Sequence, residues 1–356
     1  MRWNKLRIEN DFAFEGGGSV SGIDVVYHTS DRDYQKGERV VWVCHALTAN
    51  SDPLDWWPEM VGKGCYIDPE KDYVVCVNIF GSAYGTTGPR SAFKAGSEKS
   101  SKGSKGSKGE GPLDFPKFTI RDTARLFQIV RKHLCIEEVD LLVGSSIGGF
   151  HALEWAILEG EVIKKAAFIA TAPRVSPWLG AWMESQRMCR EAEASFRAAG
   201  SLEGGKKGLE AARALSLISY RTYEGYNLTQ AEGDEDCLFA GRVASYERYQ
   251  GEKLVKRGFD AYSYYYLTWA VDSQNVGRGR GGVAAALGQI RAESVMICIT
   301  SDGLFPPVES KEWAQWIAGA RYVEIESKWG HDGFLLETEA IAAELQSLTS
   351  EQLKKF

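Results

Sequence analysis

The sequence lacks the long apolar runs and the one-sided charge that mark two large classes of protein. No stretch approaches the roughly 18 to 20 consecutive apolar residues that span a bilayer, so no membrane span is expected. The opening residues are not followed by an apolar run of about 7 to 15 residues, and we expect no secretory signal. With 42 Lys and Arg against 48 Asp and Glu, the formal net charge is −6, which argues against a protein that binds nucleic acid through a basic face.

Paired cysteines and clustered histidines are also missing. The chain has 7 cysteines, an odd number, no Cys-x-x-Cys motif, and only 5 histidines, none of them spaced with a cysteine pair. The cysteines are Cys44, Cys65, Cys76, Cys135, Cys189, Cys237 and Cys298. This pattern indicates reduced thiols in a cytoplasmic protein rather than a disulfide framework, and it predicts no metal site.

What the sequence does have is an alternation of short apolar segments and helical periodicities. Hydrophobic residues make up 44% of the chain and charged residues 25%, as in ordinary globular proteins. Buried strands are predicted at 40–44, 73–79, 139–143, 165–170 and 294–299, with a weaker candidate at 321–325. Helices are predicted at 120–134, 148–158 and 310–317. Such alternation predicts an α/β fold, with a mostly parallel sheet covered by helices on both faces.

The alternation is interrupted between residues 174 and 284. This stretch is rich in Ala, Glu, Arg and Leu and carries aromatic residues at helical spacing. We interpret 174–284 as a helical insertion, or lid, in a core formed by 1–173 and 285–356. Within the core, 96–111 is a low-complexity segment with three Ser-Lys-Gly repeats. It is expected to be a solvated loop, because it can bury little apolar surface.

The strongest chemical signal is a Gly-x-Ser-x-Gly motif at Gly144, Ser146 and Gly148. It lies between a predicted strand and a predicted helix, the context in which a strained turn exposes a serine hydroxyl at a helix N-terminus. The glycines remove Cβ atoms that would clash with the neighbouring strand and helix. Ser146 is therefore the candidate nucleophile. A plain turn is the alternative, and Ser145 is a competing hydroxyl with the wrong glycine spacing.

A serine hydroxyl needs a base to act as a nucleophile, and the base needs an orienting acid. The chain order Ser, acid, His is met by Asp302, which follows the strand predicted at 294–299, and by His331, which follows the last predicted strand. A turn aspartate and an ordinary surface or core histidine are the alternatives. The backbone N–H groups of Ile147 and Leu47 are the candidate donors of an oxyanion hole.

Several segments are more specific in combination than singly. They are Cys44 to Thr48, Trp56 with Trp57, Asn78 to Ser91, Phe115 to Asp122, Gly144 to Gly149 with Ala152 to Trp155, Ser301 to Pro306, and Gly330 to Asp332. Together they resemble the homoserine O-acyltransferases, a branch of the α/β-hydrolase superfamily, over most of the chain. The resemblance implies an α/β-hydrolase fold with a helical lid. It also implies ping-pong transfer of an acyl group from acyl-CoA to the hydroxyl of L-homoserine in methionine biosynthesis.

The same resemblance implies further features of the site and the assembly. Acyl-CoA is a co-substrate and no cofactor stays bound, and the chain forms a homodimer through the lid. Arg213 of the lid is expected to bind the acceptor carboxylate, Asp332 the acceptor amine, and Tyr220 is expected to line the pocket. The alternatives are a helix-surface arginine for Arg213, a helix cap for Asp332 and a packing residue for Tyr220.

Other functions could use the same residues. A serine esterase or thioesterase would need the same Ser, Asp and His, but it would not need the Arg213 and Asp332 pair. A catalytically silent α/β-hydrolase that binds a ligand would not need the three catalytic candidates. The lid is short between Arg190 and Gly208, which leaves homoserine, serine and other alcohols open as acceptors. Acetyl is favoured over succinyl as the donor group, although the residues themselves do not distinguish the two.

Overall fold

The computed structural model describes residues 1–91, 112–198 and 203–350, and it centres on an eight-stranded mixed sheet. In spatial order the strands are β1 (Arg2–Ile8), β4 (Ile23–Thr29), β6 (Tyr73–Val77), β5 (Val40–Cys44), β7 (Leu141–Ser145), β8 (Lys165–Ile169), β9 (Glu293–Ile299) and β10 (Arg321–Ile325). The β1–β4 and β4–β6 pairs are antiparallel, whereas the pairs from β6 to β10 are parallel. A small second sheet pairs β2 (Phe12–Ala13) with β3 (Ser19–Val20).

The helices fall into two groups. Those of the core are α1 (Pro53–Trp56), η1 (Pro112–Asp114), α3 (Ile120–His133), α4 (Ile147–Leu158), α11 (Pro307–Ala314), η3 (Gly330–Asp332), α12 (Gly333–Leu336) and α13 (Thr338–Thr349). Those between β8 and β9 are α5 (Pro177–Glu191), η2 (Ala194–Phe196), α6 (Lys206–Tyr220), α7 (Tyr223–Gln230), α8 (Gly241–Lys256), α9 (Ala261–Asp272) and α10 (Val283–Leu287). We call this second group the lid helices.

The central strands are apolar throughout because both faces of the sheet are covered. Strands β5, β6 and β7 are buried along their whole length. On one face, Trp42 of β5 packs against Phe127 of α3 and Trp155 of α4, with ring centroids 5.9 and 4.6 Å away. On the other face, Val43 belongs to the same apolar cluster as Leu345 of α13. Two-sided burial is the reason that these strands form continuous apolar runs in the sequence.

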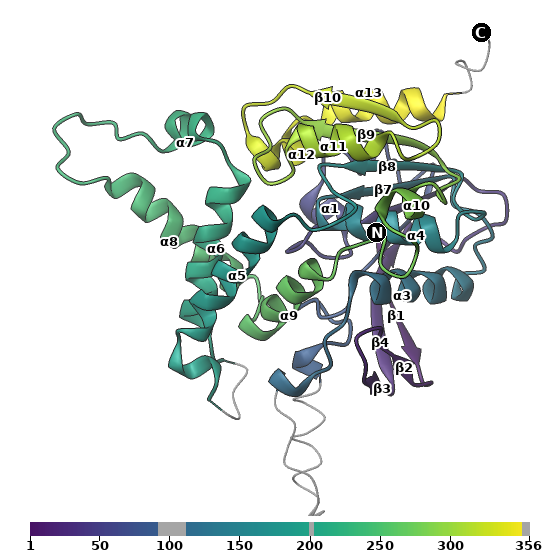
Figure 1. Cartoon of the computed structure of the whole chain (residues 1–356), viewed down its shortest axis with the longest axis horizontal. Helices are drawn as coiled ribbons and strands as arrows, with labels where there is room; N and C mark the ends of the chain where they lie inside the picture. Colours follow the sequence, from purple (N-terminus) through teal and green to yellow (C-terminus); the bar gives the residue numbers. More distant parts are fainter. Residues whose placement is uncertain (92–111, 199–202, 351–356) are drawn as a thin grey trace, which may run out of the picture.

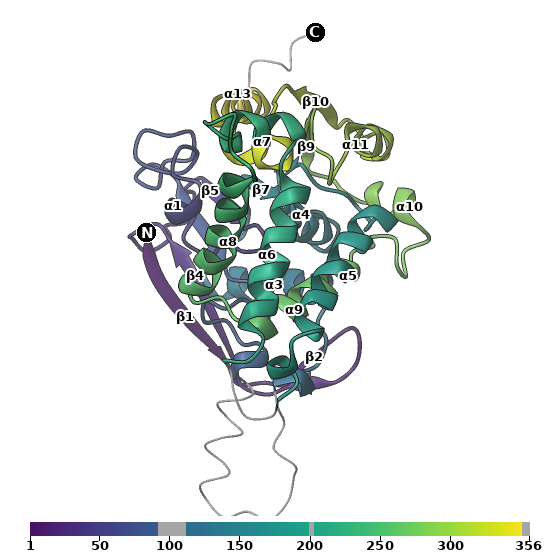
Figure 2. The same cartoon turned by 90° about the vertical axis from the view of Figure 1, so that its left-hand side faces the viewer.

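Apart from α10, which contacts α4 of the core, the lid helices stand to one side of the sheet (Figure 1). Helix α5 packs against α6 and α9, and α6 packs against α8. Seen from that side, α6 lies in front of the core helix α4 (Figure 2). Helix α6 also contacts η3, so the insertion reaches the part of the core that carries His331.

A partly buried ion network holds the segment that returns from the lid to the core. Glu154 of α4, whose side chain is 1% exposed, pairs with Arg121 of α3 at 3.2 Å and with Arg280 at 2.8 Å. Glu15 pairs with Arg121 and with Arg278, both at 2.7 Å. Because Arg278 and Arg280 lie between α9 and α10, the network ties the end of the lid to α3 and α4.

Most of the predicted elements are present, with differences that have local causes. Strand β7 begins at Leu141 rather than at residue 139 and continues to Ser145, because Gly144 and Ser145 extend the ladders with β5 and β8. Helix α11 begins at Pro307, three residues before the predicted start, with proline in its first turn. Strands β1 and β4 were not predicted. The low-complexity segment 96–111 lies outside the described residues.

In the described part of the chain, every helix is too short or too polar to cross a bilayer.

Candidate active site

The turn between β7 and α4 holds Ser146 in a conformation that few side-chain-bearing residues adopt. Its φ and ψ angles are 56° and −128°. The neighbouring glycines leave no room for a side chain. A Cβ on Gly144 would lie 2.4 Å from the carbonyl oxygen of Gly148, and a Cβ on Gly148 would lie 2.1 Å from that of Cys44. The close approach of these backbones explains the glycine spacing and leaves the Ser146 hydroxyl at the start of α4.

Two hydrogen bonds fix the backbone of Ser146. Its amide donates to the carbonyl of Ile169 at 2.9 Å, and its carbonyl accepts from the Thr171 hydroxyl at 2.8 Å. Both partners come from the end of β8 and the residues that follow it. The neighbouring strand therefore holds the strained turn in place, which is how a rare backbone conformation persists in a folded protein.

Ser146, His331 and Asp302 form one hydrogen-bonded row, although they lie far apart in the sequence. The Ser146 hydroxyl is 2.8 Å from Nε2 of His331, and Nδ1 of His331 is 2.7 Å from Oδ2 of Asp302. His331 and Asp302 are 3% and 2% exposed. In this geometry the imidazole can take the serine proton while the carboxylate holds the ring in one tautomer.

The second carboxylate oxygen of Asp302 is engaged by the backbone. Oδ1 accepts hydrogen bonds from the amides of Leu304 at 2.8 Å and Phe305 at 2.9 Å. These bonds fix the plane of the carboxylate. The Thr-Ser-Asp-Gly-Leu-Phe segment that follows β9 is therefore folded around the carboxylate.

Aromatic rings surround the imidazole of His331. The ring centroids of Phe305, Phe334 and Tyr220 lie 5.2, 5.2 and 5.7 Å from its own. Phe305 and Phe334 belong to the core, whereas Tyr220 is the last residue of α6. The lid and the core therefore both screen His331 from water, and burial raises the pKa of the Tyr220 phenol.

The two proposed oxyanion donors lie on neighbouring segments. Ile147 is the first residue of α4, so its amide has no acceptor within the helix. Leu47 is 8% exposed and follows β5, whose end lies against Gly148. The loop is held by His45, which donates from Nδ1 to the carbonyl of Ala46 at 2.9 Å and accepts at Nε2 from the amide of Ile79 at 3.2 Å.

Tyr220, the last residue of α6, lies between the other two predicted acceptor residues, Arg213 in the middle of the same helix and Asp332 in η3. The guanidinium of Arg213 lies 5.6 Å from the ring centroid of Tyr220, which in turn contacts His331. Asp332 precedes α12, but its side chain makes no capping hydrogen bond. Its Oδ2 atom instead lies 3.0 Å from Nε of Arg221. The structure thus pairs Asp332 with a cation that the sequence analysis did not single out.

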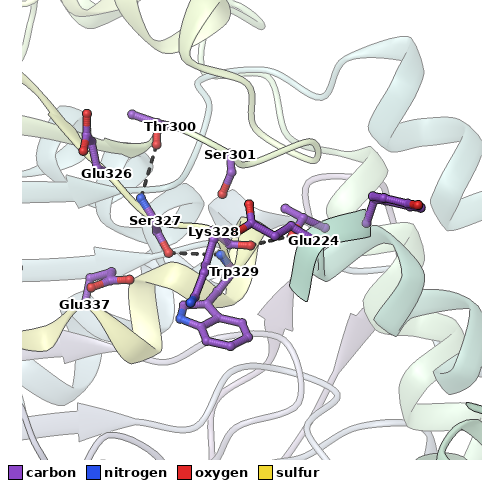
Figure 3. Close-up of a pocket in the computed structure, with 10 residues that line it drawn as sticks. Glu224, Thr300, Ser301, Glu326, Ser327, Lys328, Trp329 and Glu337 are labelled. Atoms are coloured by element: carbon purple, nitrogen blue, oxygen red, sulfur yellow. Dashed lines mark hydrogen bonds between the residues drawn. The ribbon is translucent and has the colours of Figure 1, made fainter. Parts of the chain in front are cut away.

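A cavity of about 750 Å³ lies between the start of α7 and the loops after β9 and β10 (Figure 3). Its walls carry mostly hydroxyls and carboxylates, from Thr222, Glu224, Thr300, Ser301, Glu326, Ser327 and Glu337, together with Tyr223, Lys328 and Trp329. Ser146, His331 and Asp302 do not line it. Figure 3 shows two hydrogen bonds that brace the loop before His331, from the amide of Ser327 to Thr300 and from the amide of Trp329 to the Ser327 hydroxyl.

Comparison with known proteins adds to this geometry. Residues 39–203 match the family described as the alpha/beta hydrolase fold. The homoserine O-acetyltransferase of Cyclobacterium marinum is 36% identical over 337 residues, which cover 94% of this chain and 92% of that protein. That of Chlorobaculum tepidum is 37% identical over 336 residues, covering 92% and 89%. The chain belongs to the homoserine O-acetyltransferase family. The resemblance found in the sequence is thereby confirmed.

Solved structures agree with the family on the fold. The homoserine O-acetyltransferase from Bacillus anthracis superposes with a TM-score of 0.86 at 20% identity, covering 100% of this chain and 99% of that one. Esterase E22 superposes with a TM-score of 0.83 at 19% identity, covering 98% and 100%. The predicted α/β-hydrolase fold is confirmed, and it is a scaffold that this family shares with proteins named as esterases.

Proposed function

We propose that this chain transfers an acetyl group from acetyl-CoA to the hydroxyl of L-homoserine, a step of methionine biosynthesis. The observation that carries the proposal is the row Asp302–His331–Ser146, with 2.7 and 2.8 Å between successive partners. The names of relatives at 33–37% identity, homoserine O-acetyltransferases, support acetyl as the group and homoserine as the acceptor.

The first half-reaction loads Ser146. His331 takes the hydroxyl proton as Oγ attacks the thioester carbonyl, and the resulting oxyanion accepts hydrogen bonds from the amides of Ile147 and Leu47. The carbon–sulfur bond then breaks, and His331 returns its proton to the departing CoA thiolate. Asp302 stabilises the imidazolium between these two proton transfers.

The second half-reaction unloads the serine. His331 takes the proton of the acceptor hydroxyl, the oxygen attacks the acetyl carbonyl, and the ester bond to Ser146 breaks as its oxygen recovers a proton from His331. Arg213 and Asp332 would bind the carboxylate and the ammonium of the acceptor. The aromatic residues around His331, Tyr220 of the lid among them, would keep water from competing for the acyl-enzyme.

The test is product analysis with matched donors and acceptors. The purified chain is incubated with acetyl-CoA or succinyl-CoA, and with homoserine or serine, and the products are identified by mass spectrometry. We expect O-acetylhomoserine to dominate and thiol release to depend on homoserine. Equal thiol release without an acceptor would identify a thioesterase instead, and O-acetylserine as the main product would reassign the acceptor.

We also propose that the chain forms a homodimer through the lid. The support is three exposed apolar side chains of the lid: Tyr223, the first residue of α7, and Leu238 and Phe239 in the segment before α8, at 88%, 83% and 79% exposure. Covering such a surface is favourable, and large exposed apolar patches mark association sites. Light scattering on the eluted protein should give twice the chain mass. Replacement of Leu238 and Phe239 by Glu should then give the single chain mass.

A cytoplasmic location is proposed from the cysteines. All seven thiols are free, which suits a reducing compartment. Alkylation of the denatured, unreduced protein taken from its cells should modify every cysteine. Recovery of disulfide-linked peptides would contradict the proposal.

A further inference from the structure

The end of α6 docks on the loop that carries His331. Gly330 has a φ of 66°, and a Cβ there would lie 2.8 Å from the carbonyl oxygen of Tyr220. The Thr222 hydroxyl donates to the carbonyl of Lys328, a bond drawn in Figure 3. Residues 220–222 and 328–332 therefore fit together backbone against backbone, and the lid and the histidine loop share one interface.

Arg221 makes the ionic contact of this interface. Its Nε lies 3.0 Å from Oδ2 of Asp332, and the two side chains are 26% and 20% exposed. Within the described residues, the other oxygen of Asp332, Oδ1, makes no hydrogen bond or ion pair. One oxygen of the carboxylate is held and the other is left open to a ligand.

The guanidinium of Arg221 also lies near an aromatic ring of the lid. It lies 5.2 Å from the ring centroid of Tyr246 on α8, a distance at which a cation is attracted to the ring face. Arg213, the arginine predicted to bind the acceptor carboxylate, lies over the ring of Tyr220 instead. The two arginines thus occupy different aromatic faces, and of the two only Arg221 has an ion-pair contact with Asp332 in the described structure.

We propose that Arg221 is a positioning residue of the acceptor site, holding one oxygen of Asp332 so that the other receives the ammonium of an amino-acid acceptor. This inference rests on the proposed function. A carboxylate held on one side by a fixed cation loses less rotational freedom when it binds a second cation. Because Asp332 follows His331 directly, the same contact keeps the ammonium in register with the base.

The experiment uses acceptor analogues to separate positioning from a general structural role. Arg221→Met keeps the length of the side chain and removes its charge and donors. Three acceptors are compared: homoserine, the hydroxybutanoate that lacks only the amine, and the aminopropanol that lacks only the carboxylate. We expect kcat/KM to fall about 10- to 100-fold for the two acceptors that carry the amine, mainly through KM, and to change little for the hydroxybutanoate.

A matched control comes from another ion pair between lid and core. Arg257, which follows α8, pairs with Asp55 of α1 at 2.6 Å, and both side chains are more than 40% exposed. Arg257→Met should leave all three acceptors within about twofold of the unmodified protein. Arg221→Lys should restore part of the lost discrimination for the amine, because it returns a cation without the planar fork.

Other results would overturn the inference. An equal loss for all three acceptors would show that Arg221 acts on His331 or on folding. A loss confined to acceptors with a carboxylate would make Arg221 a direct carboxylate ligand, and a lower KM for homoserine in Arg221→Met would make it a competitor of the ammonium. If the unmodified chain makes no O-acetylhomoserine, the proposed function fails and the inference with it. If the unmodified chain makes O-acetylhomoserine and Arg221→Met keeps the same preference among the three acceptors, only the inference fails.

Discussion

The oxygen of Ser146 is the single atom on which the proposed chemistry depends most. Replacing Ser146 by Ala should lower kcat about 1,000-fold or more, because no other hydroxyl lies in hydrogen-bond contact with Nε2 of His331 in the described structure. The unfolding curve should stay close to that of the unmodified chain, since the backbone contacts of Ser146 remain. Steady-state kinetics and urea denaturation measure the two effects.

Ser145 provides the control for this substitution. Its hydroxyl is buried and has no hydrogen-bond partner in the part of the chain that the structure describes, so Ser145→Ala should keep the activity and the fold. If the two alanine variants lost activity equally, the elbow would be sensitive to any substitution. The assignment of Ser146 as the nucleophile would then lose its support.

A second residue-scale effect concerns a buried charge. Arg190 of α5 is fully buried, and within residues 1–91, 112–198 and 203–350 none of its guanidinium nitrogens has a hydrogen-bond partner. Among the described residues, the guanidinium lies over the ring faces of Tyr264 and Tyr265, at 4.7 and 5.8 Å. Burial lowers the pKa of Arg190 to about 10. An apolar side chain of similar length should therefore be more stable at this position.

We expect Arg190→Met to raise the free energy of unfolding by about 1–3 kcal/mol. The matched control is Arg187 on the same helix, whose side chain is 4% exposed but paired with Asp272 at 2.6 Å and with Glu184 at 2.7 Å. Arg187→Met should destabilise the protein, because it leaves the Asp272 carboxylate without its partner. Urea denaturation of both variants gives the comparison. Destabilisation by Arg190→Met would show that the guanidinium has a stabilising contact after all.

At the scale of elements, the ion network around Glu154 joins the lid to the core. Glu154→Ala leaves Arg280 without its carboxylate and removes one of the two carboxylates of Arg121. We expect a loss of about 3 kcal/mol, because the remaining charges are partly buried. Urea denaturation measures the loss. Glu293→Ala, which removes an exposed partner 3.8 Å from Lys165, should cost less than about 1 kcal/mol. Similar losses in both variants would contradict the role of the network.

The elements that the sequence predicted are those whose signal is local. Strands β5 to β9 are short apolar runs because both faces of the sheet are covered. The glycine spacing around Ser146 follows from backbones in close contact. Strand β1 was missed because it is an edge strand whose side chains alternate between half-buried and exposed, with charged residues on the exposed side. Its partner β4 was missed with it.

In the candidate site, too, only some residues could be identified from local sequence patterns. Ser146, Asp302 and His331 could be proposed from the chain order of three motifs, which has a chemical reason. Arg221 could not, because an arginine at the end of a helix has no distinguishing pattern until the fold brings Asp332, 111 residues further along the chain, to its side. Sequence motifs identify reacting groups more readily than the residues that position them.

For the molecule as a whole, two buried histidines tie stability to pH. Burial lowers the pKa of His45 to about 4 and that of His151 to about 3, whereas an exposed histidine of the unfolded chain has a pKa of about 6.5. Below that pH the two histidines bind protons in the unfolded chain, whereas in the folded chain they stay neutral. The free energy of unfolding should therefore fall as the pH drops from about 6.5 towards 4, by up to ~1.4 kcal/mol per pH unit for each histidine.

The comparison of the unmodified chain with His151→Gln isolates this effect. Buried carboxylates such as Asp122 and Asp272, whose pKa values burial raises, act in the opposite direction, but they are present in both proteins and cancel in the difference. Urea denaturation at several pH values between 6.5 and 4.5 gives the free energy of unfolding as a function of pH. This free energy should depend less steeply on pH in the variant, and the difference in slope should correspond to about one proton taken up on unfolding. The variant will be less stable near neutral pH, yet its deficit should shrink as the pH falls. A deficit that stays constant over this range would mean that His151 is already protonated in the folded protein, or that it stays neutral in both states, and would contradict the assigned role of its burial.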